Sequence, residues 1–478
     1  MARRQRIAEW NPEDTTGWAA GNSRIARRNL IWQVVTVHTA FSIFYLWSVM
    51  VLFMPREVYG FSTGDKLLIG ATASLVGGLA RIPYAMAGAR FGGRNWAVLS
   101  SMVLLIPTAG TMWLLAHPGL PLWPYLVCAA LTGLGGGSYT SSMANAEGFY
   151  PQRLKGLALG LTGGLANLGS AAVQMVGLLV LATAGHEAPY LVCSFYLVLL
   201  AVAGLGAALF MDNLHYRIDM SHFKAALKVP DSWGIAVLYL CASGSFLGFA
   251  FAFGEVLEHN FVISGQSHGQ AALHAAQVAF IGPLLGSLAR VAGGHLSDRF
   301  GGGRVTVFVF GASILAAGLL VVVSTHDDLT RGPGEPVTLA TTIGYVVGFI
   351  ALFAFCGAAK GAVYKLIPTM FELRSRTLDV SDAERRHWAR VMSGTLIGFA
   401  GAFGALGGVG ISLVLRQSYD SAGTETPAFW IFFICYIAAT VLAWARYVRP
   451  QRAGIPEAVG ETPERWPHSP AAVETVGS

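Results

Sequence analysis

The chain has 478 residues, of which 54% are hydrophobic and 12% are charged, and its mean hydropathy is +0.54. A soluble domain carries about a quarter of its residues as Asp, Glu, Lys and Arg, so this composition excludes an ordinary soluble enzyme and indicates a chain solvated largely by lipid. The net charge of +6 requires no nucleic-acid partner, because no basic motif interleaved with aromatic residues accompanies it.

Apolar segments long enough to cross a hydrocarbon core of about 30 Å recur along the whole chain. They predict an all-α membrane protein with twelve transmembrane helices, at 31–54, 67–89, 97–116, 122–145, 156–183, 190–211, 232–255, 271–296, 305–324, 338–364, 391–415 and 428–447. All five cysteines lie singly inside these segments, so we expect packing residues and neither a metal site nor a disulfide. No nucleophile with a base, phosphate loop or cofactor motif indicates an enzyme.

The basic residues predict the orientation of the chain in the membrane. Of the 32 Lys and Arg residues, 25 lie in the N-terminal tail, in the even-numbered loops and at the C-terminal end, whereas four lie in the odd-numbered loops. By the positive-inside rule both termini face the cytoplasm, which an even number of crossings allows. The remaining three, Arg81, Arg290 and Lys360, fall within predicted spans.

Two of these cations belong to an internal repeat. "GGLARIPYAMAGARFGG" (77–93) aligns without gaps with "GSLARVAGGHLSDRFGG" (286–302), which pairs Arg81 with Arg290. We therefore expect two homologous six-helix halves, at 31–211 and 232–447, joined by a cytoplasmic loop at 212–231 and flanked by cytoplasmic tails at 1–30 and 448–478.

The repeat also predicts how deep the two arginines lie. Nine helical residues separate each of them from the basic residue at the membrane boundary, Arg90 or Arg299, which places them about 13–14 Å in, near the midplane. No Asp or Glu occurs at that depth in any span, so an anion supplied from outside is the simplest partner. The alternative is that each guanidinium reaches the interface or caps carbonyls of a broken helix.

Glycine-rich segments predict close packing in the fourth, fifth and eleventh spans. "GLTGGLANLG" (160–169) is related to "GFAGAFGALG" (398–407), but Asn167 corresponds to Ala405, so packing symmetry does not require the amide. We favour a hydrogen bond from Asn167 to a small oxyanion over bonding between helices.

These motifs resemble the nitrate/nitrite porters of the major facilitator superfamily, the NarK-type transporters. The resemblance rests on "GGGSYTSSMANAEGFYPQRLKGLALGLTGGLANLG", "LARIPY", "LARVAGGHLSDRFGG" and "GTLIGFAGAFGALGG" and spans about residues 31–447. It implies that the substrate is held between Arg81 and Arg290, one from each half. It further implies substrate contacts from Asn167, Tyr139, Tyr239, Gly164 and Gly404, and roles in cytoplasmic gating for Arg90, Asp298 and Arg299.

The chain departs from the exchanger-like members of that family at two ionisable positions. Those members usually carry an uncharged residue at Glu147 and an asparagine at Lys360. Lys360 lies close enough to Lys365 to reach the cytoplasmic interface, and this explanation stays open beside a role in proton coupling for Lys360, Glu147 or Glu255.

We therefore predict a secondary transporter of nitrate and nitrite in the bacterial plasma membrane, working as a monomer by alternating access, with a role in nitrate assimilation. The extra ionisable residues favour proton-coupled uptake over nitrate/nitrite exchange without protons. A non-transporting anion sensor on the same fold is a third hypothesis, although neither tail suggests an output domain.

Overall fold

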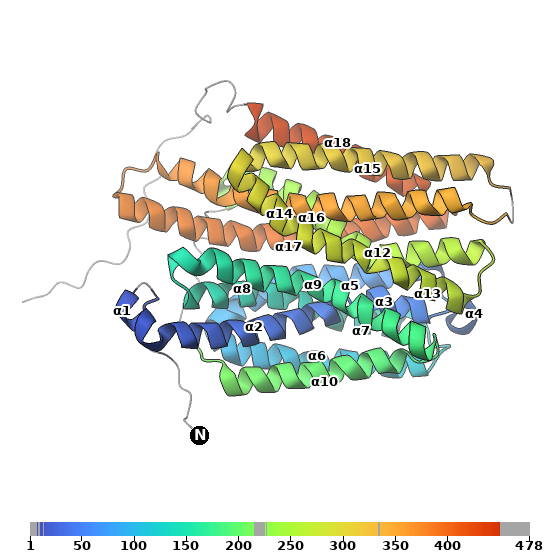
Figure 1. Cartoon of the computed structure of the whole chain (residues 1–478), viewed down its shortest axis with the longest axis horizontal. Coiled ribbons are helices and arrows are strands. Elements are labelled where there is room, and N and C mark those ends of the chain that lie inside the picture. The colour runs from blue at the N-terminus through green and yellow to red at the C-terminus, as the bar shows by residue number, and fades with distance from the viewer. Residues whose placement is uncertain are drawn as a thin grey trace, which may run out of the picture.

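The computed structural model describes residues 7, 10–12, 14–214, 225, 227–332 and 335–449. Every named element within these residues is a helix, as the composition predicts. Most of the expected inter-half loop and of the C-terminal tail lies outside the described residues. Two sets of helices, here called the first half and the second half, lie side by side as two layers (Figure 1).

The first half precedes the gap at residues 215–224. Its elements are α1 (Thr15–Gly17), the π-helix η1 (Trp18–Asn22), α2 (Ser23–Phe44), α3 (Trp47–Met50), the 3-10 helix η2 (Val51–Phe53), α4 (Arg56–Tyr59), α5 (Thr63–Phe91), α6 (Gly93–Ala116), α7 (Leu122–Gly133), the 3-10 helix η3 (Leu134–Gly137), α8 (Ser138–Phe149), α9 (Gln152–Ala184) and α10 (Pro189–Phe210).

The second half follows that gap. Its elements are α12 (Pro230–Ile263), α13 (His268–Ala279), α14 (Ile281–Phe300), α15 (Gly302–Thr330), α16 (Leu339–Ser375), α17 (Asp382–Ala422) and α18 (Thr426–Tyr447). We call the end of the bundle where α2 begins and α18 ends the terminal end, and the opposite end, where α5 begins and α12 ends, the distal end.

Eleven helical segments of the described chain are long and apolar enough to cross a membrane. The remaining crossing of the expected twelve is the fourth, which is broken into α7, η3 and α8. Glycines make this break possible: a Cβ on Gly135 would lie 2.2 Å from the Ala40 carbonyl oxygen, and one on Gly137 would lie 2.7 Å from the Tyr84 ring. The break therefore lets α8 begin in close contact with α2 and α5.

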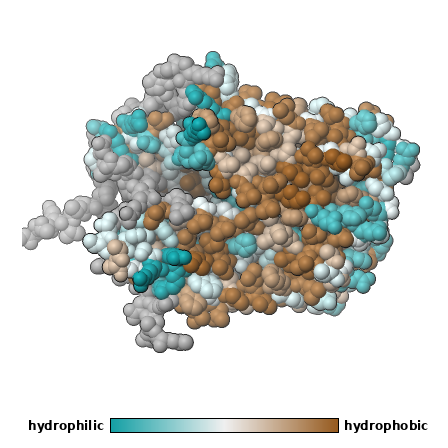
Figure 2. All heavy atoms as spheres, viewed as in Figure 1, coloured by the Kyte–Doolittle hydropathy of each residue, from teal (hydrophilic) through white to brown (hydrophobic). Residues whose placement is uncertain are grey.

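An apolar belt surrounds the middle of the molecule. In Figure 2 hydrophobic side chains cover the central surface, and hydrophilic ones gather at the two ends. On α15, Phe308, Leu315 and Val322 recur every seventh residue on one helix face and are 73%, 76% and 66% exposed. Large apolar side chains on such a stripe are stable only in contact with lipid.

Several predicted boundaries were wrong because the helices continue beyond the apolar segments. The polar stretch 365–390, expected to be a loop, is helical except at 376–381, because α16 continues to Ser375 and the Ser381 capping box starts α17 at Asp382. Lys66, expected in a loop, lies in the first turns of α5 and is buried. Apolar length alone does not reveal polar turns that pack against the other half.

The two halves pack mainly through α5 against α17 and α9 against α14. A Cβ on Gly78 of α5 would lie 2.8 Å from the Cβ of Ala405 on α17. One turn away the Ser74 hydroxyl donates to the Ala405 carbonyl at 3.1 Å. Small residues thus bring the backbones of opposite halves together near the centre of the molecule.

The break in the fourth crossing gives a testable stability effect. Gly135→Ala should destabilise the protein by about 1–3 kcal/mol, because its Cβ overpacks a backbone carbonyl that cannot move aside. Gly410→Ala on α17 is the matched control, since its Cβ would meet no atom within 4 Å. Thermal unfolding in detergent should show a lower melting temperature for Gly135→Ala alone; equal melting temperatures would contradict the packing described.

Candidate functional site

Arg81 lies in the middle of α5 and is buried, with 4% of its surface exposed. Its Nη1 donates a hydrogen bond across the interface to the Gly401 carbonyl of α17. Its Nε is buried without a hydrogen-bond partner in the described chain. This charged N–H group can donate a hydrogen bond to an additional oxygen atom, such as that of a bound anion.

Arg290 lies on α14, and Tyr139 connects it to Arg81. The Arg290 Nη2 donates to the Tyr139 hydroxyl at 3.0 Å. The Arg81 guanidinium carbon lies 5.6 Å from the centre of the Tyr139 ring. Tyr139 is the second residue of α8, so the glycine break before that helix determines where this ring lies. The structure thus brings together the two repeat-matched arginines around one tyrosine.

Two further aromatic rings border the arginines from the second half. Tyr239 of α12 and Tyr364 of α16 stack with centroids 4.3 Å apart and planes 8° apart. The Arg290 guanidinium carbon lies 5.2 Å from the Tyr364 ring centre. A Cβ on Gly404 would lie 2.8 Å from the Tyr239 ring, so glycine at this position leaves room for the stacked pair.

Asn167 and Lys360 meet across the interface beside these groups. The buried Lys360 ammonium on α16 donates to the Asn167 Oδ1 of α9 at 3.3 Å and lies 4.1 Å from the Phe246 ring centre. The Asn167 amide nitrogen donates to the Gly163 carbonyl of its own helix at 2.8 Å. The amide is therefore bonded within its own helix and to a helix of the second half, and bonding between helices was the alternative considered from the sequence. A hydrogen bond from Asn167 to an oxyanion stays a prediction.

The electrostatic character of the site is strongly positive. Arg81, Arg290 and Lys360 come together from both halves, and among the described residues no carboxylate forms an ion pair with any of them. Uncompensated buried charges are unfavourable, whereas an anion bound between the guanidiniums would offset them. The arrangement is suited to binding a small anion and contains no group placed for covalent chemistry.

The glycines of α9 and α17 near the site differ in their surroundings. A Cβ on Gly160, Gly164, Gly394 or Gly398 would meet no atom within 4 Å, and these positions lie toward the terminal end of the two helices. Further along α9, a Cβ on Gly169 would lie 2.7 Å from the His38 carbonyl of α2. Glycine at 169 therefore lets α9 pack closely against α2 within the first half.

The residues expected to act in gating lie at the terminal end, away from the arginine pair. Asp298 forms an ion pair with Lys365, so both partners belong to the second half. Arg90 and Arg299 lie over the rings of their own neighbours, Phe91 and Phe300. Their roles in gating stay predictions.

The remaining ionisable candidates lie apart from each other. Glu147 is partly buried on α8, near the terminal end. Glu255 lies at the distal end of α12 and contacts Lys66 of the first half. Lys360 contacts Asn167 beside the arginine pair.

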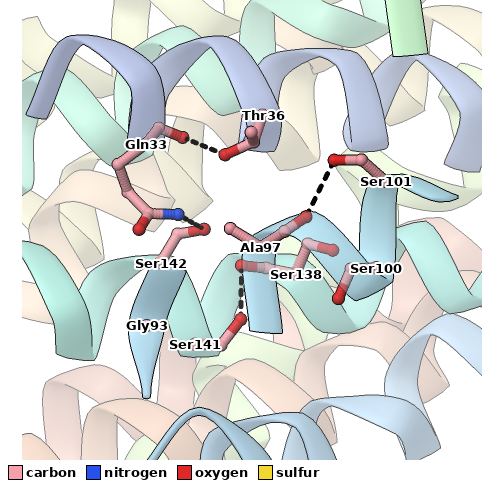
Figure 3. Close-up of a pocket in the computed structure, with 9 residues that line it drawn as sticks. All are labelled: Gln33, Thr36, Gly93, Ala97, Ser100, Ser101, Ser138, Ser141 and Ser142. Atoms are coloured by element: carbon pink, nitrogen blue, oxygen red, sulfur yellow. Dashed lines mark hydrogen bonds between the residues drawn. The ribbon is translucent and has the colours of Figure 1, made fainter. Parts of the chain in front are cut away.

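A separate polar hollow lies inside the first half, between α2, α6 and α8 (Figure 3). Gln33 donates to the Ser142 hydroxyl at 2.7 Å, and the Ser100 and Ser138 hydroxyls have no partner in the described chain. It contains no charged side chain, and its lining consists of Gln33, Thr36, Gly93, Ala97, Ser100, Ser101, Ser138, Ser141 and Ser142. Such a hollow accommodates water and is not an anion site.

Sequence reasoning missed Tyr364, Gly401 and Phe246 as neighbours of the site. Tyr364 lies one helical turn after Lys360, so the i, i+4 spacing could have placed it on the same face. Gly401 contributes only a carbonyl, and no side-chain pattern predicts that contact.

Comparisons with known proteins agree with this architecture. The family model described as "Major Facilitator Superfamily" matches residues 34–377. The solved structures of a D-xylose-proton symporter and of the nucleoside transporter NupG are similar in fold, each with a TM-score of 0.57. They are 16% and 13% identical to this chain, cover 90% and 87% of it, and are themselves covered over 99% and 97%.

Two curated relatives are similar over nearly the whole chain. The nitrate/nitrite transporter NarU of Salmonella typhimurium is 31% identical over 465 residues, and the probable nitrate/nitrite antiporter NarK2 of Thermus thermophilus is 28% identical over 462 residues. In both cases the alignment covers 93% of this chain and 96% of the relative. The chain therefore belongs to the major facilitator superfamily and, within it, to the family of nitrate/nitrite transporters.

Proposed function

We propose that the protein carries nitrate and nitrite across the bacterial plasma membrane by alternating access, with the anion held between Arg81 and Arg290. The observation that carries the proposal is the meeting of two repeat-matched guanidiniums at Tyr139, where neither forms an ion pair with a carboxylate of the described residues. A guanidinium offers planar paired donors that match the coplanar oxygens of nitrate and nitrite. The relatives' names support the choice of anion.

The two halves, 31–211 and 232–447, are proposed to rock about this site as units of one monomer. An anion between the guanidiniums removes the repulsion that opposes their approach, so the loaded carrier reorients more readily than the empty one. The excess of basic residues supports placing both termini in the cytoplasm. With this orientation, the distal end, where Lys66 of the first half contacts Glu255 and Glu258 of the second, faces the outside.

Proton coupling is proposed to use Lys360. Its ammonium is buried, contacts an amide oxygen and a phenyl ring among the described residues, and shares the site with two guanidiniums. A bound anion compensates this third charge, so protonation of Lys360 and anion binding favour each other. Glu147 is a second candidate for the coupling proton.

Nitrate/nitrite exchange without protons is the second candidate function. It is favoured by the printed names of two relatives from Thermus thermophilus, each a probable nitrate/nitrite antiporter. In that mechanism the Lys360 charge is permanent, and only an anion-loaded carrier reorients.

The arginine pair can be tested directly. Arg81→Lys and Arg290→Lys should each weaken nitrate binding at least about tenfold and abolish flux, because one ammonium cannot replace paired charge-assisted hydrogen bonds. Arg416→Lys is the matched control, since its exposed ion pair with Asp420 lies within one helix. Calorimetric titration with nitrate, with melting temperatures to verify folding, measures the effect; unchanged binding in both site variants would refute the clamp.

The coupling mode can be separated in liposomes containing the purified protein. Proton-coupled uptake predicts nitrate entry driven by an imposed proton gradient with no nitrite inside. In Lys360→Asn this entry should be lost while exchange against internal nitrite persists; Lys228→Asn, on an exposed side chain, is the control. Entry that requires internal nitrite and ignores the gradient would favour exchange. No flux in either format would favour the sensor hypothesis.

A further inference from the structure

A cluster of buried charges joins the halves at the distal end. Lys66 of α5 lies with its Nζ 3.2 Å from Glu255 Oε2 and 3.3 Å from Glu258 Oε2, both on α12. The exposed fractions of Lys66, Glu255 and Glu258 are 6%, 2% and 2%. The contact therefore exists only while the distal ends of the two halves lie together.

His268 and Glu57 connect this cluster to solvent. The His268 Nδ1 lies 3.5 Å from Glu258 Oε1, and its Nε2 lies 2.9 Å from Glu57 Oε2. The side chain of His268 is 24% exposed and that of Glu57 is 71% exposed. Protons from the distal side can reach the buried carboxylates along this edge without passing the anion site.

The charges inside the cluster do not balance. Two carboxylates face one ammonium: Glu255 Oε2 is within ion-pair distance of Lys66 and Glu258 Oε1 within ion-pair distance of His268, but neither oxygen accepts a well-aligned hydrogen bond in the described chain. A buried unpaired carboxylate is unfavourable, whereas one proton added to the pair leaves a neutral acid, a carboxylate and an ammonium. Glu255 Oε2 and Glu258 Oε1 are thus positions where that proton can bind.

His268, the first residue of α13, is the titratable neighbour that contacts the glutamate pair directly; the other charged and titratable groups described nearby have different partners or lie at the surface. His259 of α12 lies 3.3 Å from the Thr63 hydroxyl, and its ring packs edge-on against Tyr419 of α17. Arg331, after α15, pairs with Asp327. Arg56 of α4 is exposed at the surface.

We propose that Lys66, Glu255 and Glu258 form a proton-dependent latch: binding of one proton from the distal side, shared by the two glutamates, permits the distal end to close. Raising the pH on that side removes the proton, leaves an excess negative charge in the closed interface and shifts the population toward the state that is open at the distal end. The inference rests on the alternating access and orientation proposed above.

The position of the latch separates its proton from the coupling proton. Arg81 follows Lys66 by fifteen positions in α5, a distance of about 22 Å along the helix. In the closed state the latch is connected only to the distal side, so its proton returns to the side from which it came. The latch therefore sets how readily the carrier closes and does not transport protons.

Distances between spin labels can test the latch without any transported anion. The labels are placed on Ala184→Cys and Ala422→Cys, two exposed positions at the distal ends of α9 and α17, in a variant whose five native cysteines are replaced and whose melting temperature is unchanged. In nanodiscs without nitrate, between about pH 5 and 9, the ratio of closed to open distances should fall with rising pH, by at most about tenfold per pH unit for one proton.

Three variants determine whether the glutamate pair is responsible. Glu258→Gln balances the ammonium with one carboxylate, so its distal end should stay closed at high pH and lose the dependence. Lys66→Gln leaves two carboxylates alone, so closure should require a lower pH. Asp420→Asn, whose carboxylate at the same end is already balanced by Arg416, should behave as the parent protein does.

A distance distribution of the parent that ignores pH would overturn the latch, as would a Glu258→Gln protein that keeps the parental pH dependence. If the distances in His268→Gln no longer depend on pH, the titrating group is the imidazole. That result would overturn the assignment of the proton to the glutamate pair. Because the labels report conformation without substrate, the result is independent of whether the chain carries nitrate.

Discussion

The central constraint on this protein is the meeting of two guanidinium groups, the buried Arg81 and the partly buried Arg290, where no carboxylate of the described residues contacts them. Each is stabilised in the structure by weaker means: a backbone carbonyl for one, a phenol for the other, and aromatic faces for both. These partners satisfy hydrogen bonds but leave the net charge in place. The site therefore gains more from an anion than a pair of arginines already matched by acids would.

The backbone around the site is arranged to meet that constraint. The glycine break between α7 and α8 places Tyr139 between the arginines, and Gly404 leaves room for the stacked Tyr239 and Tyr364 rings. Other glycines let α5 and α17 approach closely enough for the guanidinium of Arg81 to reach a carbonyl on the opposite half. The glycine-rich composition is thus a requirement of the site as well as of lipid-embedded packing.

Most of the fold was predictable from the sequence because each membrane span is a continuous apolar segment, whose length can be found without knowing the tertiary structure. The repeat made the pairing of Arg81 with Arg290 predictable, since two copies of one motif lie at equal depth in two halves. Lys66 was wrongly predicted to lie in a loop because a single charge next to an apolar segment is typical of the end of a membrane span. Its partners Glu255 and Glu258 are distant in the sequence and come close to it only in the tertiary structure. The helical course of 365–390 was missed for the same reason.

The two contacts between the halves carry excess charge of opposite sign. Around Tyr139, three cations come together without a carboxylate of the described residues; about 22 Å away, two buried carboxylates face the Lys66 ammonium. Each contact is thus incomplete by itself and becomes neutral or less charged when a small ion binds: an anion at the first, a proton at the second. Neither contact is electrically balanced without its ion. The closed conformation of the empty, deprotonated carrier is therefore disfavoured at both contacts. An ionic imbalance built into each interface can therefore link two separate binding events to one rocking movement, without any direct contact between the bound ions.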